Sequence, residues 1–237
     1  MNFLINFFNL ILYHPLLNSL ILLYQYLPGH DFGLSVILLT VLIRLILYPL
    51  MSQSLKSQKA LSGLQLKIQE IQKKYVNDKE KQATEMIGLY QREKINPFSG
   101  LILVFLQLPI LIALYQVFWK GLRPEEMVNL YSFVAQPERI NPTFLGLVNL
   151  AEASLFLAIL AGIIQFFQTK LTLPQKEKGA EKTTPQFSDI FQKQMIYFFP
   201  IFTVLILLRL PAAISLYWIV TSLFSIIQQY FIFKPST

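Results

Sequence analysis

Cysteine is absent from this 237-residue chain, and charged residues are scarce at 14%. The absence of cysteine excludes disulfides, thiolate metal sites, a cysteine nucleophile and an acylated lipoprotein N-terminus. Histidine is nearly absent too: His14 and His30 are the only two, and no His-Glu-x-x-His motif occurs. Soluble domains carry roughly 25% charged residues. The low charge and the 54% of hydrophobic residues therefore indicate a membrane protein.

The apolar residues are gathered in blocks that are nearly free of charge. These blocks are residues 32–51, 98–119, 150–168, 195–210 and 212–233. All but the short fourth block approach or exceed the roughly 20 residues with which a helix crosses a bilayer. The blocks lack the alternation of a barrel strand, and only helices and closed barrels satisfy their backbone hydrogen bonds in lipid. The sequence thus predicts an all-α, polytopic membrane protein.

Residues 1–30 form a separate apolar segment without lysine or arginine. A secretory signal peptide begins with positive charge, so we do not expect one here. His14, Pro15, Asn18 and Pro28 interrupt the apolar run. These interruptions favour a helix that lies in the membrane interface over a full span.

Basic residues are distributed unevenly between alternate connecting segments. Residues 52–96 hold nine Lys and Arg, residues 169–194 hold five and Lys234 follows the last block, whereas the opposite set of segments holds four. By the positive-inside rule the N-terminus lies outside and the C-terminus in the cytoplasm, which an odd number of spans satisfies. Basic loops also bind nucleic acids, but the chain has no recognisable binding motif, and membrane topology already explains the asymmetry. We therefore expect no specific nucleic-acid partner.

Residues 52–96 show the pattern of two amphipathic helices. Apolar residues recur at spacings of three and four, at Leu61, Leu64, Ile68, Ile71 and Tyr75 in the first half and at Ala83, Met86, Ile87 and Tyr90 in the second. Val76-Asn77-Asp78 breaks the pattern, and Asn77 or Asp78 is placed to cap a new helix. This predicts an antiparallel helical hairpin. The stripes alone leave open whether it is a solvated connector or a functional flap beside the cytoplasmic mouth.

Arg44 is a charged residue inside the first apolar block, where it is thirteenth of twenty. An arginine at the centre of a membrane helix costs roughly 3 to more than 10 kcal/mol, a cost that a buried anionic partner would reduce. Twelve of the 13 acidic residues lie outside the apolar blocks, and Glu152 lies at the edge of the third. We therefore expect the Arg44 guanidinium to face water rather than lipid, with some snorkelling toward the interface.

Other polar residues could line the same cavity. Thr40 and Tyr48 lie one helical turn on either side of Arg44. Further candidates in the later blocks are Gln107, Gln116, Gln165, Gln168, Ser215, Trp218, Ser222, Ser225 and Gln229. The serines are equally consistent with a small-residue packing face between helices. Trp218 lies in the middle of its block rather than at an interface, so it is a better candidate for a cavity wall.

A water-filled groove with one fixed positive charge would attract acidic or polar segments of another polypeptide and lower the cost of their entry into the membrane. Such an insertase makes no bonds, so we expect a non-enzymatic protein without a cofactor or metal. The alternative is a secondary transporter or channel with a polar site at the midplane. Transporters usually carry internal repeats and ion-coordinating residues, and no repeat is visible in this sequence.

Several motifs resemble those of the YidC/Oxa/Alb insertase family. In family order from about residue 10 to residue 233, they are residues 39–50 around Arg44, Leu89-Tyr90, Ile95-Asn96-Pro97, Gln107-Leu108-Pro109-Ile110, Ala113-Leu114-Tyr115, Phe144-Leu145-Gly146, residues 162–168, residues 210–220 and residues 226–229. The resemblance implies a five-transmembrane-helix insertase core with a cytoplasmic helical hairpin, an N-terminal interfacial helix and a hydrophilic groove closed toward the outside. It also favours the hairpin as a functional flap.

The resemblance assigns Arg44 as the groove arginine, Thr40 as a groove residue one turn away, Gln165 as the groove glutamine of the third span and Trp218 as an aromatic that contacts the passenger. Gln107 and Ser215 complete the predicted substrate-binding groove. The implied partners are nascent membrane proteins, ribosome–nascent chain complexes, a Sec translocon and the lipid bilayer. The implied location is the bacterial plasma membrane.

The expected division of the chain is an interfacial segment 1–30, a transmembrane helix 31–51, the hairpin 52–96, a second transmembrane helix 97–119, an extracytoplasmic loop 120–149, a third transmembrane helix 150–169, a cytoplasmic loop 170–194, the fourth and fifth transmembrane helices 195–233 and a tail 234–237. Unlike many family members, the chain is expected to have no large extracytoplasmic domain, no lipoprotein cysteine and no basic tail. Ribosome contact would then use the loops.

Overall fold

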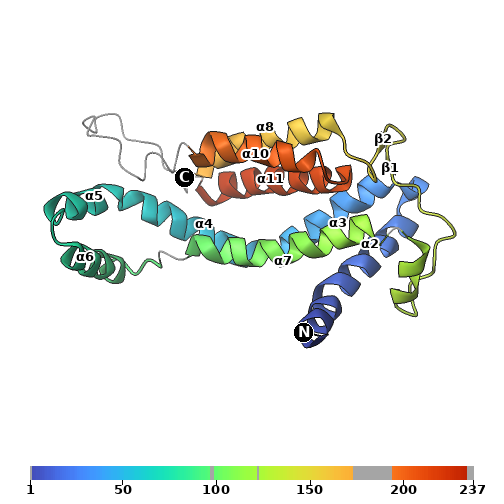
Figure 1. Ribbon diagram of the computed structural model, residues 1–237, viewed down its shortest axis with the longest axis horizontal. Helices are drawn as coiled ribbons and strands as arrows, with labels where there is room; N and C mark the ends of the chain where they lie inside the picture. The colour runs from blue at the N-terminus through green and yellow to red at the C-terminus, as the bar shows by residue number, and fades with distance from the viewer. Residues whose placement is uncertain (1, 97–98, 122, 173–193, 234–237) are drawn as a thin grey trace.

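The structure is a computed structural model that describes residues 2–96, 99–121, 123–172 and 194–233. Most of the predicted cytoplasmic loop 170–194 and the predicted tail 234–237 lie outside these residues. Figure 1 shows an elongated bundle of helices with a helical hairpin at one end and a short two-stranded sheet at the other. We call these the hairpin end and the sheet end.

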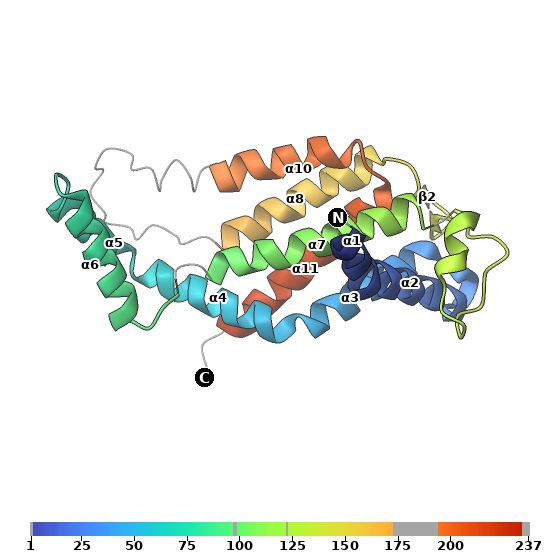
Figure 2. The ribbon, with the colours of Figure 1, turned by 60° about the horizontal axis from the view of Figure 1, so that its bottom comes forward.

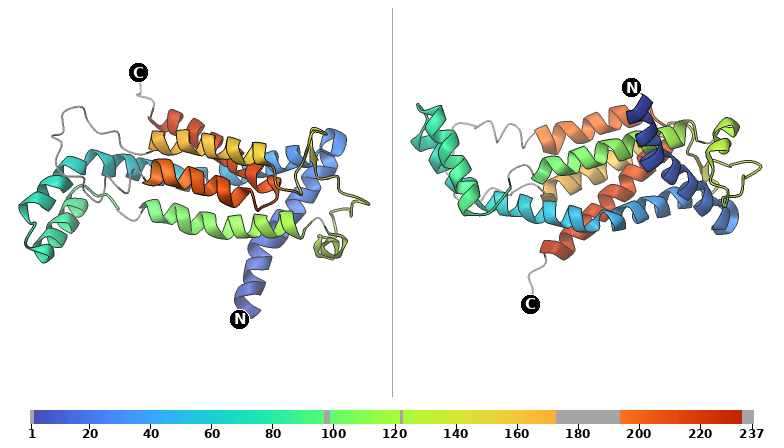
Figure 3. Two further views of the ribbon diagram at one scale, coloured as in Figure 1. Left: turned by 45° about the horizontal axis from the view of Figure 1, so that its top comes forward. Right: turned by 90° about the horizontal axis from the view of Figure 1, so that it is seen from below.

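The N-terminal segment is one continuous helical stretch, made of α1 (Asn2–Phe8), the π-helical turn η1 (Asn9–Tyr13) and α2 (His14–Tyr26). Pro15 lies at the start of α2, directly after the π-helical turn, and the helical stretch continues through it. Phe3–Tyr26 is long and apolar enough to cross a membrane. The segment leaves the bundle at a steep angle (Figure 3), and its position in the interface stays a prediction.

The chain turns at η2 (Pro28–His30) and enters α3 (Phe32–Ile46) and then α4 (Tyr48–Gly63). Asp31 caps α3, since its Oδ1 accepts a hydrogen bond from the Leu34 amide at 2.8 Å. The α3 and α4 axes differ by 65°. The structure bends the helix predicted for residues 31–51 near Leu47, because Pro49 has no amide hydrogen to continue the hydrogen-bond ladder. Its assignment as one transmembrane helix stays a prediction.

The hairpin consists of α5 (Gln65–Lys74) and α6 (Lys79–Arg92), which pack against each other. Asp78 caps α6 by accepting a hydrogen bond from the Lys81 amide at 2.9 Å. Lys67 and Glu93 form an ion pair across the two helices, with 2.6 Å between Nζ and Oε1. The first arm is divided at Leu64 into α4 and α5 rather than being one helix.

The remaining elements are α7 (Ser99–Trp119), the 3-10 helix η3 (Pro124–Asn129), β1 (Thr143–Phe144), β2 (Val148–Asn149), α8 (Leu155–Thr172), the π-helical turn η4 (Gln194–Phe198), α10 (Phe199–Leu207) and α11 (Ala212–Phe233). The two strands are antiparallel, with Thr143 opposite Asn149. Helices α7, α8, α10 and α11 run side by side along the long axis together with α3 and α4 (Figure 2).

The chain is an all-α polytopic membrane protein. Within the described residues, three helices are long and apolar enough to cross a membrane, namely Phe3–Tyr26, Leu155–Thr172 and Ala212–Phe233, and the bent α3–α4 pair gives a fourth candidate. Phe105–Trp119 and Gln194–Leu207 are shorter apolar helices. The core count of five spans stays a prediction.

Helix α11 packs against α8 and α3, and α8 also packs against α10. The α8–α10 contact is close at Gly162, where an added Cβ would lie 2.3 Å from Cγ2 of Val204 and 3.3 Å from the carbonyl oxygen of Pro200. Only a residue without a side chain fits there without movement of a neighbour. Gly162 thus allows the close spacing of α8 and α10.

At the sheet end, the N-terminal segment is bonded through η1 and α2 to the loop that follows α7. The Tyr13 hydroxyl donates to Glu126 Oε2 at 2.7 Å, and the buried Asn18 amide donates to the Asn129 carbonyl at 3.2 Å. Asn18 Oδ1 also accepts from the Tyr131 amide at 2.6 Å. The predicted outer loop 120–149 is therefore fixed to the N-terminal segment by side chains that are themselves buried or half-buried.

Candidate functional site

The side chain of Arg44 lies inside the bundle, with only 6% of the residue exposed. Its Nη1 is 3.7 Å from the thioether sulfur of Met51, and no carboxylate among the described residues lies within ion-pairing distance of it. The guanidinium thus lies inside the bundle rather than on its lipid-facing surface. That it faces water stays a prediction. Met51, which follows the bend between α3 and α4, lies against the guanidinium.

Thr40 and Ser215 are both buried, at 1% and 0% exposed. The Thr40 hydroxyl donates to the Val36 carbonyl of its own helix at 2.6 Å. Ser215 Oγ has no hydrogen-bond partner among the described residues. Thr40 is thus satisfied by the backbone of α3, while Ser215 keeps an unused hydroxyl in the middle of the bundle.

Two predicted groove residues make hydrogen bonds to α11. The Gln107 amide of α7 donates to the Tyr217 hydroxyl, and the Trp218 indole donates to Gln165 Oε1 of α8 at 3.1 Å. Because Tyr217 and Trp218 are adjacent on α11, they point to different neighbours, α7 and α8. Polar side chains therefore link three helices across the centre of the bundle.

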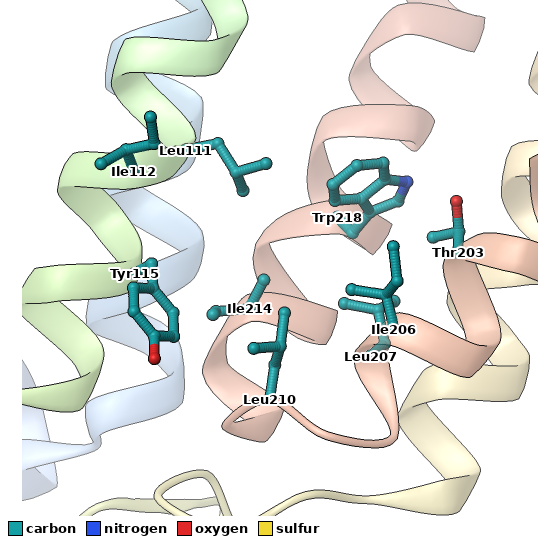
Figure 4. Close-up of a pocket in the computed structure, with 9 residues that line it drawn as sticks. All are labelled: Leu111, Ile112, Tyr115, Thr203, Ile206, Leu207, Leu210, Ile214 and Trp218. Atoms are coloured by element: carbon teal, nitrogen blue, oxygen red, sulfur yellow. The ribbon is translucent and has the colours of Figure 1, made fainter.

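A pocket of about 270 Å³ lies between α7, α10 and α11. Its lining is mainly apolar and consists of Leu111, Ile112, Tyr115, Thr203, Ile206, Leu207, Leu210, Ile214 and Trp218. Figure 4 shows Leu111 and Tyr115 on one wall facing Ile214, Leu210 and Trp218 on the other. Of the six predicted groove residues only Trp218 lines it, so the pocket and the Arg44 site are separate places.

Sequence reasoning missed two features of this region. The apolar pocket was not predicted, because its lining residues have the composition of any membrane helix. Gln228 was not selected as a site residue either, although its buried amide donates to the Tyr48 carbonyl at 3.2 Å and to the Ser52 hydroxyl at 2.9 Å. Its place in the family motif at residues 226–229 was the available signal.

No group of three or more His, Asp or Glu side chains that could hold a metal ion occurs in the part of the chain that the structure describes. The polar groups at the centre of the bundle are one guanidinium, amides and hydroxyls. These groups can accept and donate hydrogen bonds and can attract an anion.

A bundle of apolar helices around one arginine and several linked amides is typical of a helical membrane protein that handles a polar or charged guest. The chain belongs to the family described as 60Kd inner membrane protein, whose model matches residues 22–237. The resemblance stated from the sequence motifs is thereby confirmed. The chain is a bacterial membrane protein.

Individual relatives have been assigned names that agree with this. The chain is 35% identical over 204 residues to a "Membrane protein insertase YidC" of Fusobacterium nucleatum, which covers 86% of this chain and 87% of that protein. It is 32% identical over 223 residues to "Membrane protein insertase MisCA" of Bacillus subtilis, with 92% and 77% covered. A YidC insertase of Geobacter metallireducens is 30% identical over 220 residues, which are 93% of this chain but only 36% of that protein.

Proposed function

We propose that the chain is a membrane protein insertase that receives nascent membrane proteins and releases them laterally into the bilayer. The names of its relatives support this function. The observation that carries the proposal is Arg44, a buried guanidinium whose only hydrogen-bond partner among the described residues is a thioether. A charge held in this way keeps most of its hydrogen-bonding capacity for a guest.

The guest that fits Arg44 is the carboxylate of an entering polypeptide. A guanidinium binds a carboxylate through charge-assisted hydrogen bonds, which are roughly twice as strong as neutral ones. Such a contact offsets part of the cost of taking an acidic segment out of water. While Arg44 binds the carboxylate, other polar side chains would contact the same segment of the passenger. These side chains are Thr40, Gln107, Gln165 and Ser215.

The apolar pocket suits a different part of the passenger. Its walls are mostly leucine and isoleucine from α7, α10 and α11, and such walls favour an apolar helix over a polar one. Trp218 lies at its edge and is bonded to Gln165, so it stands between the polar centre and the pocket. A passenger would pass from Arg44 toward this pocket and then into lipid.

By the positive-inside rule, the basic segments favour an orientation with the hairpin end and the C-terminus in the cytoplasm and the sheet end outside. The location is then the bacterial plasma membrane. Nascent chains would arrive at the hairpin end, from a ribosome or from a Sec translocon. The hairpin α5–α6 carries five lysines and Arg92 and offers a basic surface for such contacts.

The decisive experiment compares Arg44→Ala with wild type in proteoliposomes. The passenger is a short single-span protein whose translocated segment carries acidic residues, and a version with these residues replaced by Asn and Gln is the control. We expect Arg44→Ala to insert the acidic passenger several-fold less well and Arg44→Lys to retain more activity, because charge is the requirement. Equal insertion of the acidic passenger by wild type and Arg44→Ala would contradict the proposed mechanism.

Contact with the passenger can be measured separately from insertion. A photoreactive residue at position 40 or at position 218 should crosslink to a ribosome-stalled passenger. A photoreactive residue at Phe3, which is 79% exposed on the N-terminal segment, serves as a control and should not crosslink. Crosslinks that are as strong from Phe3 as from Trp218 would contradict a defined passenger route.

A further inference from the structure

Met51 covers Arg44 on the side of the hairpin end. It lies in the first turn of α4, seven residues after Arg44, and a straight helix would place it almost two turns further along. The bend of 65° between α3 and α4 brings its sulfur to 3.7 Å from the guanidinium. Both residues are only 6% exposed. The thioether thus separates the charge from the cytoplasmic end of the bundle.

A thioether sulfur is a weak hydrogen-bond acceptor without charge. It shields the guanidinium without neutralising it, whereas a carboxylate at the same place would form a strong internal ion pair. Methionine is also unbranched and flexible, so it can move aside within a packed core. These properties suit a cover that a stronger acceptor displaces.

The position of the cover is fixed by α11. Gln228 donates to the Tyr48 carbonyl and to the Ser52 hydroxyl. Tyr48 precedes Met51 in α4, and Ser52 follows it. Lys59, two turns further along α4, lies with its Nζ 4.6 Å from the ring centroid of Phe233 at the end of α11. α4 is therefore anchored to α11 both before and after Met51, and the Met51 side chain can move while the backbone stays in place.

We propose that Met51 is a positioning and specificity-determining residue for the passenger: it covers Arg44 at rest and yields to a passenger carboxylate because it competes weakly for the guanidinium. The inference rests on the proposed function and adds the selection for acidic segments. Met51 acts through Arg44 and sets how strong an acceptor a passenger must offer.

The first test changes the acceptor strength at position 51 with little change in shape. Met51→Glu should lower insertion of the acidic passenger about tenfold, because an internal ion pair occupies Arg44, and Met51→Gln should lie between Met51→Glu and wild type. Gln53→Glu adds the same charge two residues away, where the side chain is exposed, and should insert the acidic passenger as well as wild type does. Wild-type insertion by Met51→Glu, or an equal loss in Gln53→Glu, overturns the inference.

The second test measures the chemical accessibility of Arg44 in the absence of a passenger. Phenylglyoxal modifies arginine, and peptide mass spectrometry compares its rate at Arg44 with the rate at Arg92, whose side chain is 68% exposed on the hairpin. Removal of the cover in Met51→Ala should raise the relative rate at Arg44 several-fold. An unchanged rate overturns the inference that Met51 covers Arg44. If instead Arg44→Ala inserts the acidic passenger normally, the proposed function fails, while this labelling still decides whether Met51 covers Arg44.

Discussion

Gln228 of α11 donates hydrogen bonds to both Tyr48 and Ser52 of α4, at 3.2 and 2.9 Å. The two acceptors lie directly after the bend that Pro49 introduces. A helix bend in lipid needs such a partner, because backbone groups freed at the bend find no water there. One buried amide therefore stabilises the change of direction that places Met51 over Arg44.

Replacement of this amide should destabilise the fold. We expect Gln228→Leu to lower the free energy of unfolding by about 1–2 kcal/mol, since two hydrogen bonds from a buried amide are lost. Thermal unfolding in detergent measures the change. Ile227→Ala is the control, because Ile227 is 56% exposed on the same helix. An equal loss in both variants would show that the amide has no special role.

The close contact between α8 and α10 predicts a compensating pair of substitutions. Gly162→Ala should cost about 1–3 kcal/mol, because the added methyl overlaps Val204. Val204→Ala in the same chain removes the overlapping methyl groups and should restore part of the stability. The difference between the double variant and the sum of the single ones is read from thermal unfolding. Simple additivity would contradict the contact.

The bond between Tyr13 and Glu126 should hold the loop after α7 against the N-terminal segment. Tyr13→Phe removes only the hydroxyl, and we expect the free energy of local unfolding to fall by about 1.5–3 kcal/mol, the range for a hydrogen bond to a charged group. Hydrogen exchange of the amides around Glu126 should become faster. Tyr26→Phe is the matched control, because Tyr26 is 81% exposed on the same segment and should leave that exchange unchanged. Unaltered exchange in Tyr13→Phe would refute the role of this bond.

Asp31 joins α3 to the loop that contains β1 and β2. Its Oδ1 accepts from the Leu34 amide at 2.8 Å, and its Oδ2 accepts from the Leu145 amide at 2.5 Å. Asp31→Ala should therefore cost more than the loss of a helix cap alone, about 1 kcal/mol. Asp31→Asn keeps one acceptor oxygen, so its free energy of unfolding should lie between those of wild type and Asp31→Ala. Chemical unfolding monitored by fluorescence orders the three proteins, and a cost for Asp31→Ala no larger than that of a cap would contradict the second contact.

The sequence predicts the helices and the place of Arg44 because apolar blocks and single charges are local features. Asp78 as the cap of α6 follows equally from a local pattern. The contact between Arg44 and Met51 does not, since it depends on how far the chain turns at Pro49. A proline permits a bend, but its angle is set by partners such as Gln228, which lies 180 residues away from Tyr48.

The burial of Arg44 could not be predicted for a related reason. The sequence shows that acidic residues are scarce in the apolar blocks, which leaves water as the expected neighbour. The neighbour that the structure shows for Arg44 is a sulfur atom of Met51. Because this sulfur is uncharged, counting charged residues in the sequence does not reveal the contact. The pocket beside Trp218 could not be predicted either. The shape of a pocket between three helices depends on how the helices pack and not on the type of the lining residues.

The contacts between α4 and α11 lie at different distances from the bend at Leu47. Gln228 bonds Tyr48 and Ser52, within about 8 Å of the bend along the helix, and Lys59 contacts Phe233 about 18 Å from it, at 1.5 Å for each residue. These contacts tie α4 to α11 over most of its length. Movement of the hairpin beyond the end of α4 therefore leaves the backbone beneath Met51 in place.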